Sequence, residues 1–241
     1  MTPDPDTAPP RPGPVVCGVD GSPSATDAAW AAARAAAWLG VGLHLVRALE
    51  WPAAGVPGLP PGDAGRVAAR RSALTELSRL ADAVQVSHPG VPVTGGLTDG
   101  TAVDVLTSAA VGASLLVVGV RGHSAREGPR AGSVAVALAR STPGPLLVHR
   151  QAAPGADGVV VAADGAPGSA ALLDTALRTT RPGLQACQRV SRVPSGALLL
   201  ELSATSSLAV VGRPPGAGPL AETTSTLLRR GPCAVLVVPV S

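Results

Sequence analysis

The sequence contains no lysine, asparagine, isoleucine, phenylalanine or tyrosine. All 19 basic residues are therefore arginines, which excludes chemistry that depends on a lysine, such as a Schiff base, a P-loop or a kinase-type site. The aromatic residues are Trp30, Trp38 and Trp51, so the chain is poorly equipped to bind nucleic acid by stacking bases on aromatic rings. The missing residue types have A/T-rich codons, and a GC-rich genome explains their absence better than any function does.

Charge is also scarce, because charged residues make up only 15% of the 241 residues and the net charge is +3. Basic and acidic residues are scattered along the chain, whereas binding to a nucleic-acid backbone needs a concentrated basic face. We therefore expect no nucleic-acid partner. Apolar residues make up 46%, which excludes general disorder and supplies core material for one large domain or two smaller ones.

The sequence offers neither a zinc motif nor a targeting segment. Cys17, Cys187 and Cys233 lie far apart without Cys-x-x-Cys or Cys/His spacing, and an odd number of buried-looking thiols suggests a reducing compartment. Residues 1–14 carry six prolines and no apolar run, so we expect a disordered tail and not a signal peptide. The most apolar stretch, 25–45, is interrupted by charged residues, which argues against a membrane span. We expect a cytoplasmic protein that does not bind membranes.

Short apolar runs alternate with helical patterns, which is typical of an open parallel sheet covered by helices on both faces. The predicted strands are 15–19, 43–49, 91–96, 115–120 and 145–149. The first predicted helix follows the strand 15–19 and ends near residue 39. The other predicted helices span 64–86, 102–111 and 133–140, and residues 51–62 are predicted to form a loop. The sequence therefore predicts an α/β domain with a five-stranded parallel sheet over residues 15–150.

After a predicted linker at 151–157 the pattern restarts. Val159–Gly165 echoes Val15–Gly21, and residues 193–212 lie without gaps over residues 100–119. We interpret this as an internal duplication. The second copy, 158–241, is the shorter one, because it lacks roughly the second strand and the second helix.

The segment with a chemical signature is Gly119-Val120-Arg121-Gly122, followed after nine residues by Gly132-Ser133-Val134. Glycines let backbone N–H groups approach an anion, and a helix N-terminus adds unpaired donors and a favourable dipole. The Ser133 hydroxyl supplies another donor, and the intervening loop is basic, with Arg121, His123, Arg126 and Arg130. Asp20, after the first strand, falls at the same sheet edge and is a natural acceptor for ribose hydroxyls or an adenine amino group.

The Asp20-Gly21-Ser22 turn, the G-x2-G-x9-G-S pattern and the closing strand Pro145–His149 resemble the ATP-binding branch of the universal stress protein family. The resemblance covers residues 15–149. It implies that Asp20 contacts the nucleoside and that Leu45 lines the adenine pocket. It also implies that ribose and phosphates are surrounded by Gly119, Arg121, Gly122, Gly132, Ser133 and Val134. The implied ligand is ATP, with or without Mg²⁺, acting as a regulatory effector in a stress response together with an unidentified protein partner.

The second copy departs from this pattern. Gly212 matches Gly119, but Pro215 falls where Gly122 stands, and Ala221-Glu222 replaces Gly132-Ser133. Proline removes a backbone donor and a carboxylate repels an anion, so we expect this copy not to bind ATP, although Asp164 remains. Its expected role is structural. Domains of the family often pair through their last strands, so Leu146–Val148 and Val235–Val238 are expected to pair, either within the chain as a pseudo-dimer or between two chains.

Two other functions stay open at this point. A slow ATPase or phosphotransferase is the weaker one, because the sequence offers no lysine, no clear general base beside the glycine loop and no metal-binding carboxylate pair. We therefore expect no enzyme. The other is a structural or protein-interaction module that binds no nucleotide, in which Asp20 is only a helix cap and the glycine segment an ordinary turn.

Overall fold

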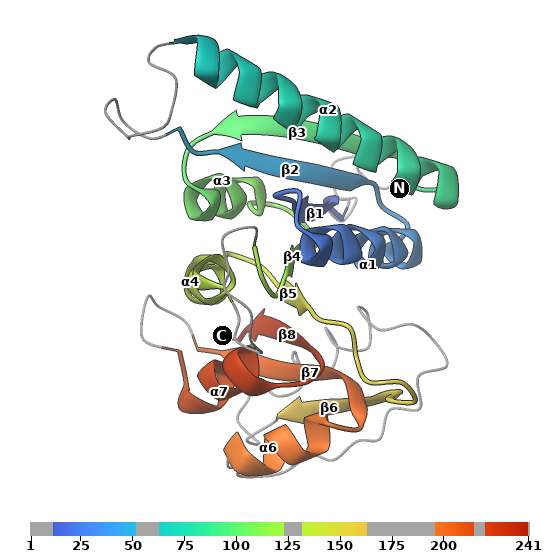
Figure 1. Ribbon diagram of the computed structural model, residues 1–241. Helices are drawn as coiled ribbons and strands as arrows, with labels where there is room; N and C mark the ends of the chain where they lie inside the picture. The colour runs from blue at the N-terminus through green and yellow to red at the C-terminus, as the bar shows by residue number, and fades with distance from the viewer. Residues whose placement is uncertain (1–11, 52–62, 123–131, 163–195, 215–219, 241) are drawn as a thin grey trace, which may run out of the picture.

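In the part of the chain that the structure describes, eight strands form a single sheet, which Figure 1 shows as a stack from β3 to β6. The computed structural model describes residues 12–51, 63–122, 132–162, 196–214 and 220–240. The strands are β1 (Val15–Gly18), β2 (Leu43–Leu49), β3 (Val93–Asp99), β4 (Leu115–Gly119), β5 (Leu146–His149), β6 (Gly158–Ala162), β7 (Ser206–Arg213) and β8 (Ala234–Pro239). The helices are α1 (Pro23–Leu39), α2 (Asp63–Ser87), α3 (Ala102–Ala109), α4 (Ser133–Ser141), α6 (Gly196–Ser203) and α7 (Glu222–Arg230).

The first five strands are parallel and lie in the order β3-β2-β1-β4-β5. The predicted α/β fold is confirmed. The chain runs outward from β1 to β3 on one side and then crosses back to β4 on the other. The strand order therefore reverses between β1 and β4, and the carboxyl ends of these two strands form the place where open α/β sheets bind ligands.

The last strands of the two halves pair within the chain. Leu146, Leu147 and Val148 of β5 lie opposite Val237, Leu236 and Val235 of β8 in antiparallel register. Beyond β8 the strands are again parallel, in the order β8-β7-β6. The order β6-β7-β8 has the same neighbours as β1-β4-β5, which is the arrangement that an internal duplication predicts. The duplication itself and its domain boundaries stay predictions.

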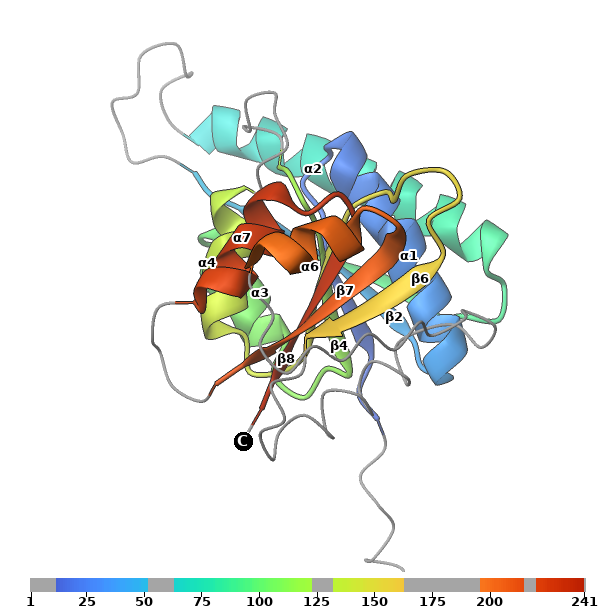
Figure 2. The same cartoon turned by 90° about the horizontal axis from the view of Figure 1, so that it is seen from below.

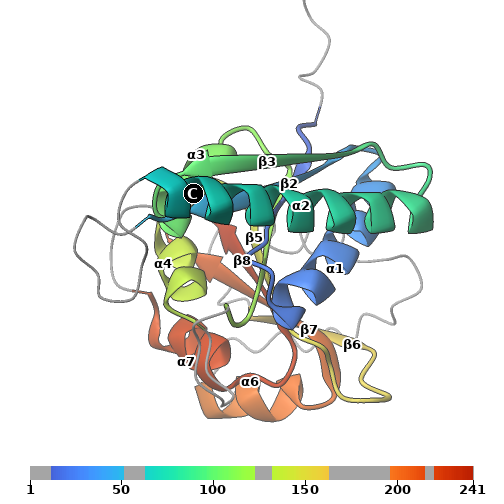
Figure 3. The ribbon, with the colours of Figure 1, turned by 45° about the horizontal axis from the view of Figure 1, so that its top comes forward.

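Helices cover both faces of the sheet, as Figure 2 shows. On one face α1 and α2 pack on Val15, Cys17, Leu43 and Leu45. On the other face α3 and α4 cover the strands of the first half, at residues such as Val16 and Leu116, and α6 and α7 cover β6, β7 and β8. Figure 3 shows α2 running along β3 at the edge of the sheet. A strand that is buried on both faces has a continuous run of apolar residues, and this is why these strands could be predicted from the sequence.

Helix α1 lies close to the sheet because its buried side chains are small. The buried residues of this helix are all alanines: Ala25, Ala28, Ala29, Ala31, Ala32, Ala33, Ala35 and Ala36. Ser22 caps its first turn by accepting a hydrogen bond from the Ala25 N–H, and Pro23 occupies the first helical position. Gly40 ends it in the left-handed conformation with φ of 67°.

Differences from the predicted elements are small. β3 runs to Asp99, three residues past the predicted end, because this edge strand is half exposed and its polar and glycine residues hide its length. Residues 1–11 of the predicted tail, most of the predicted loop 51–62, and Cys187 lie outside the described residues. Within the described ranges, no helix combines the length and the apolar character that a bilayer crossing requires.

Candidate functional site

Two segments far apart in sequence meet at the carboxyl ends of β1 and β4. The two strands are adjacent and parallel, with Gly18 opposite Val118, so the residues that follow them leave the sheet at the same edge. Asp20 and Gly122 come into contact there: a Cβ built on Gly122 would lie 2.8 Å from Oδ2 of Asp20. The structure therefore brings together the acidic turn and the glycine segment that the sequence analysis singled out.

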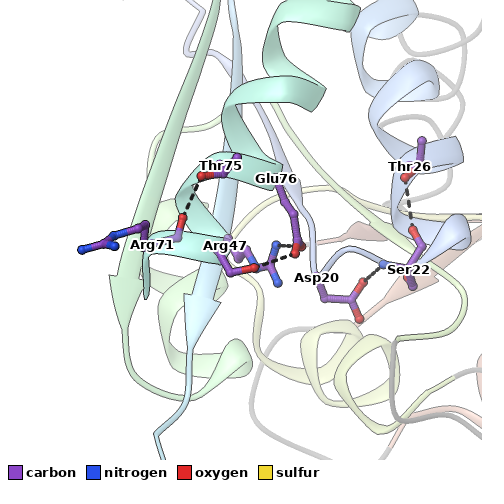
Figure 4. A network of polar contacts seen from close by, with 8 residues as sticks. Asp20, Ser22, Thr26, Arg47, Arg71, Thr75 and Glu76 are labelled. Atoms are coloured by element: carbon purple, nitrogen blue, oxygen red, sulfur yellow. Dashed lines mark hydrogen bonds and ion pairs between the residues drawn. The ribbon is translucent and has the colours of Figure 1, made fainter. Parts of the chain in front are cut away.

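Hydrogen bonds within the turn and across to the glycine segment fix the Asp20 turn. The Ser22 N–H donates to Asp20 Oδ1 at 3.0 Å, as Figure 4 shows, and Gly21 takes a φ of 86°. The Ser22 hydroxyl also donates to the Arg121 carbonyl at 3.4 Å. Asp20 thus supports the start of α1 through one carboxylate oxygen while the other faces Gly122. The helix-capping role and a ligand role for this residue are compatible.

Gly119 allows β4 to approach the first turn of α1. A Cβ at this position would lie 2.7 Å from the backbone carbon and oxygen and from the hydroxyl of Ser24, a distance that real side chains do not reach. The Arg121 N–H donates to the same Ser24 hydroxyl at 3.4 Å. Ser24 therefore orients the first residues of the glycine segment. The sequence pattern predicts no such role for Ser24.

Helix α4 begins beside Gly122. Its N-cap is Gly132, whose N–H donates to the Val120 carbonyl at 2.8 Å and which provides no side-chain cap. A Cβ on Gly132 would lie 3.7 Å from the Gly122 nitrogen, so the two glycines are neighbours. Ser133 is exposed, and Val134 packs partly into the core. The first-turn N–H groups of a helix have no intrahelical partner, so this end offers donors to an anion.

Leu45 does not lie beside Asp20, Gly122 and the start of α4. Its side chain is fully buried in the middle of β2, between Cys17 and Gly95 on the neighbouring strands, in the layer that α1 and α2 cover. In this arrangement the side chain presents no surface to a ligand. The adenine-lining role that the resemblance implies for Leu45 stays a prediction.

Arg47 lies next to the site, although the sequence analysis did not name it. Its guanidinium pairs with Glu76 of α2 at 2.6 Å, and both of its terminal nitrogens are 3.7 Å from a Cβ built on Gly21 (Figure 4). Ser72 donates to the other oxygen of Glu76 at 3.1 Å. The alternation of β2 could have indicated this. Leu43 and Leu45 face the core, and Arg47 is the next residue on the same face of the strand, so its charge needs an oppositely charged partner.

Positive charge gathers where β5 ends at the same edge. His149 lies opposite Gly119 in register, and Arg150 follows it. Burial lowers the pKa of Arg150, and the nearby charge of Arg121 lowers it further. Burial, followed by the charge of Arg34, also lowers the pKa of His149. The positive charges of Arg121 and Arg150 therefore lie close to each other near this edge, whereas the lowered pKa of His149 leaves that side chain neutral near pH 7.

Several predicted positions lie outside the described residues, namely His123, Arg126, Arg130, Asp164 and Pro215. In the second half, Gly212 lies near the end of β7 and Glu222 is the first residue of α7, behind an N-cap, Ala221, that makes no side-chain bond. A carboxylate therefore occupies the first turn of α7, where α4 has Ser133. Among the residues that the structure places, no three His, Cys, Asp or Glu side chains gather as a metal site.

Comparison with known proteins identifies the family. No curated protein matches this chain in sequence. A universal stress protein from Archaeoglobus fulgidus DSM 4304 has the same fold, with a TM-score of 0.73 and 14% identity over 95% of this chain and 99% of that one. A functionally unknown protein from Pseudomonas aeruginosa PAO1 gives a TM-score of 0.62 at 13% identity, over 94% and 92%. A universal stress protein in complex with cAMP gives 0.45 at 27%, over 57% and 97%.

The first two structures share the fold of nearly the whole chain, and their low identity carries no conclusion about ligands. The family model is the stronger finding, because it matches residues 13–150, more than half of the sequence. This chain belongs to the universal stress protein family.

Proposed function

We propose that the chain binds ATP at the carboxyl edge of β1 and β4 and that the nucleotide acts as a regulatory effector in a stress response. The observation that carries the proposal is the contact of the Asp20 carboxylate with Gly122, beside the N-terminus of α4. This juxtaposition offers an acceptor for a nucleoside and donors for phosphates at one place. Membership of the universal stress protein family supports the stress-related role.

The phosphates and the polar groups of the nucleoside would have suitable partners there. Backbone N–H groups at Gly122 and in the first turn of α4, together with the Ser133 hydroxyl, would bind the phosphates, and the α4 dipole would favour their negative charge. Arg121 would add a cation. Asp20 would accept hydrogen bonds from ribose hydroxyls or the adenine amino group. The second half carries Glu222 at the equivalent helix start, so we propose one nucleotide per chain.

Magnesium would enter with the phosphates. The described residues do not fit a resident magnesium site, because no cluster of carboxylates forms there and Mg²⁺ takes oxygen ligands in octahedral geometry. With ATP bound, phosphate oxygens and water would supply those ligands. We propose an effector and not a substrate, because the sequence has no lysine to stabilise a phosphoryl group in transfer.

The test is calorimetric titration of ATP, with and without Mg²⁺, into the intact protein and two aspartate variants. Gly122→Asp places a carboxylate at the phosphate site and a Cβ against Asp20. Gly90→Asp is the matched control, since a Cβ on Gly90 meets nothing within 4 Å. We expect the intact protein and the control to bind one ATP with a Kd on the order of micromolar, and Gly122→Asp to lose binding.

If the intact protein binds no ATP, the proposal is wrong and the structural-module alternative replaces it. A parallel assay of phosphate release decides between effector and slow ATPase. Release no faster than the uncatalysed rate is the expected result, and turnover abolished in Gly122→Asp would establish an enzyme instead.

A further inference from the structure

Arg213, the last residue of β7, contacts the carboxyl end of α4 in the other half of the molecule. Its Nη1 donates to the Arg140 carbonyl at 2.7 Å and its Nη2 to the Thr142 carbonyl at 2.5 Å. Thr142 is the C-cap of α4 and is almost completely buried. One guanidinium from the second half therefore binds two carbonyls at the end of a helix of the first half.

The contact is strong for two physical reasons. The last carbonyls of a helix have no intrahelical donors, and the helix dipole places negative potential at this end. A guanidinium presents two N–H groups in a fixed fork, so both carbonyls are bound in one orientation. Burial lowers the pKa of Arg213, but an arginine stays protonated in proteins, so the charge is retained at the helix end.

The arrangement also leaves polar atoms unsatisfied. Nε of Arg213 and the hydroxyl of Thr142 are buried without a hydrogen-bond partner among the described residues. Each such atom costs free energy in the folded state. The hydrogen bonds described for the Arg213 side chain are therefore the two that it donates to carbonyls at the end of α4.

The opposite end of α4 is the candidate nucleotide site. The helix has only nine residues, so about 12 Å of rigid backbone separates the Arg213 contact from Gly132 and Ser133. Within its own half, α4 packs on α3 and β5. A displacement of its carboxyl end would therefore displace its first turn relative to Gly122 and Asp20.

We infer that Arg213 is a positioning residue of the nucleotide site, through which the second half fixes the placement of α4. This inference rests on the proposed function. It assigns the second half a role in nucleotide binding, although its own helix start at Glu222 does not suit phosphate. Arg150 makes the converse contact, donating to the Leu228 carbonyl at the end of α7, but α7 carries no candidate site.

The experiment measures ATP affinity in the intact protein and in Arg213→Ala, Arg213→Lys and Leu199→Ala at a temperature where all four are folded. We expect Arg213→Ala to weaken ATP binding about tenfold. Arg213→Lys should recover part of that loss, because an ammonium keeps the charge but not the fork. Leu199 is buried in α6, which packs on α7, β6 and β7, so Leu199→Ala should lower the melting temperature without changing affinity.

Hydrogen exchange of the α4 amides, measured without nucleotide, supplies an independent reading. It should be faster in Arg213→Ala than in the intact protein and unchanged in Leu199→Ala. Equal ATP affinity in the intact protein and Arg213→Ala would overturn the inference alone. The same loss of affinity in Leu199→Ala would also overturn it, because general destabilisation would then explain the effect. No ATP binding by the intact protein would overturn the inference together with the proposed function.

Discussion

The carboxylate of Asp20 fills the space that a side chain on Gly122 would need, with Oδ2 only 2.8 Å from the position of a Cβ. The obstacle is the end of a side chain and not backbone, so a substitution at Gly122 displaces the carboxylate and leaves the fold in place. At Gly119 the obstacle is the backbone of Ser24. The two glycines therefore have different consequences when changed, one for the site and one for stability.

Gly122→Ala is expected to weaken ATP binding while the free energy of unfolding changes by less than about 1 kcal/mol. The added methyl pushes Asp20 away and narrows backbone access to phosphate. Titration calorimetry and urea unfolding on the same samples measure the two effects. Gly90→Ala, in an open turn, is the control. Unaltered affinity in Gly122→Ala would show that this glycine does not face the ligand.

Gly119→Ala is expected to destabilise the protein by about 1–3 kcal/mol, because β4 or the start of α1 must move to admit the methyl group. Urea unfolding followed by circular dichroism measures the change. The matched control is Gly144→Ala, where the nearest atom to the new Cβ, the Ala113 carbonyl oxygen, is 3.7 Å away. Equal stabilities of the two variants would contradict the packing described for Gly119.

Stability is expected to fall in acid through His149. Burial and the charge of Arg34 lower its pKa from 6.5, against a smaller opposing effect of Asp27. The unfolded chain therefore binds the proton more readily, and the stability contributed by neutral His149 is lost as pH falls below about 6.5. Unfolding free energies at pH 7.5 and pH 5.5 should differ less in His149→Gln than in the intact protein. A histidine titration by NMR should show the pKa rising in Arg34→Ala.

The thiols of Cys17 and Cys233 are expected to resist modification in the folded protein. Burial raises the pKa of Cys233 to about 11, and burial raises the pKa of Cys17 as well. In a Cys187→Ser variant, a disulfide reagent at pH 8 should modify no thiol in buffer and both in denaturant. Rapid modification without denaturant would mean that the sheet opens at β1 or next to β8.

Much of the fold could be predicted from the sequence, because strands buried on both faces appear as apolar runs and alternate with helical patterns. Val15–Gly18 and Leu115–Gly119 lie almost where the pattern placed them. The meeting of Asp20 with Gly122 also followed, since parallel strands carry their following turns to a common edge. Such features follow from local sequence patterns together with the general geometry of parallel sheets.

Features that depend on three-dimensional neighbours could not be predicted in the same way. The apolar run of β5 shows that it needs a partner strand, but nothing in the run says whether that partner is β8 of the same chain. The burial of Leu45 depends on how α1 and α2 cover β2. Arg213 is an ordinary charge at the end of a strand until β7 and α4 are placed together.

The antiparallel pairing of β5 with β8 within one chain also makes this strand pairing independent of protein concentration. Strand pairing between separate molecules weakens on dilution, whereas strands joined by one chain meet at an effective concentration on the order of millimolar, which dilution does not change. The sheet that the described residues form is therefore held together within one molecule at any protein concentration. No second copy of the chain is needed to supply the residue that contacts the end of α4.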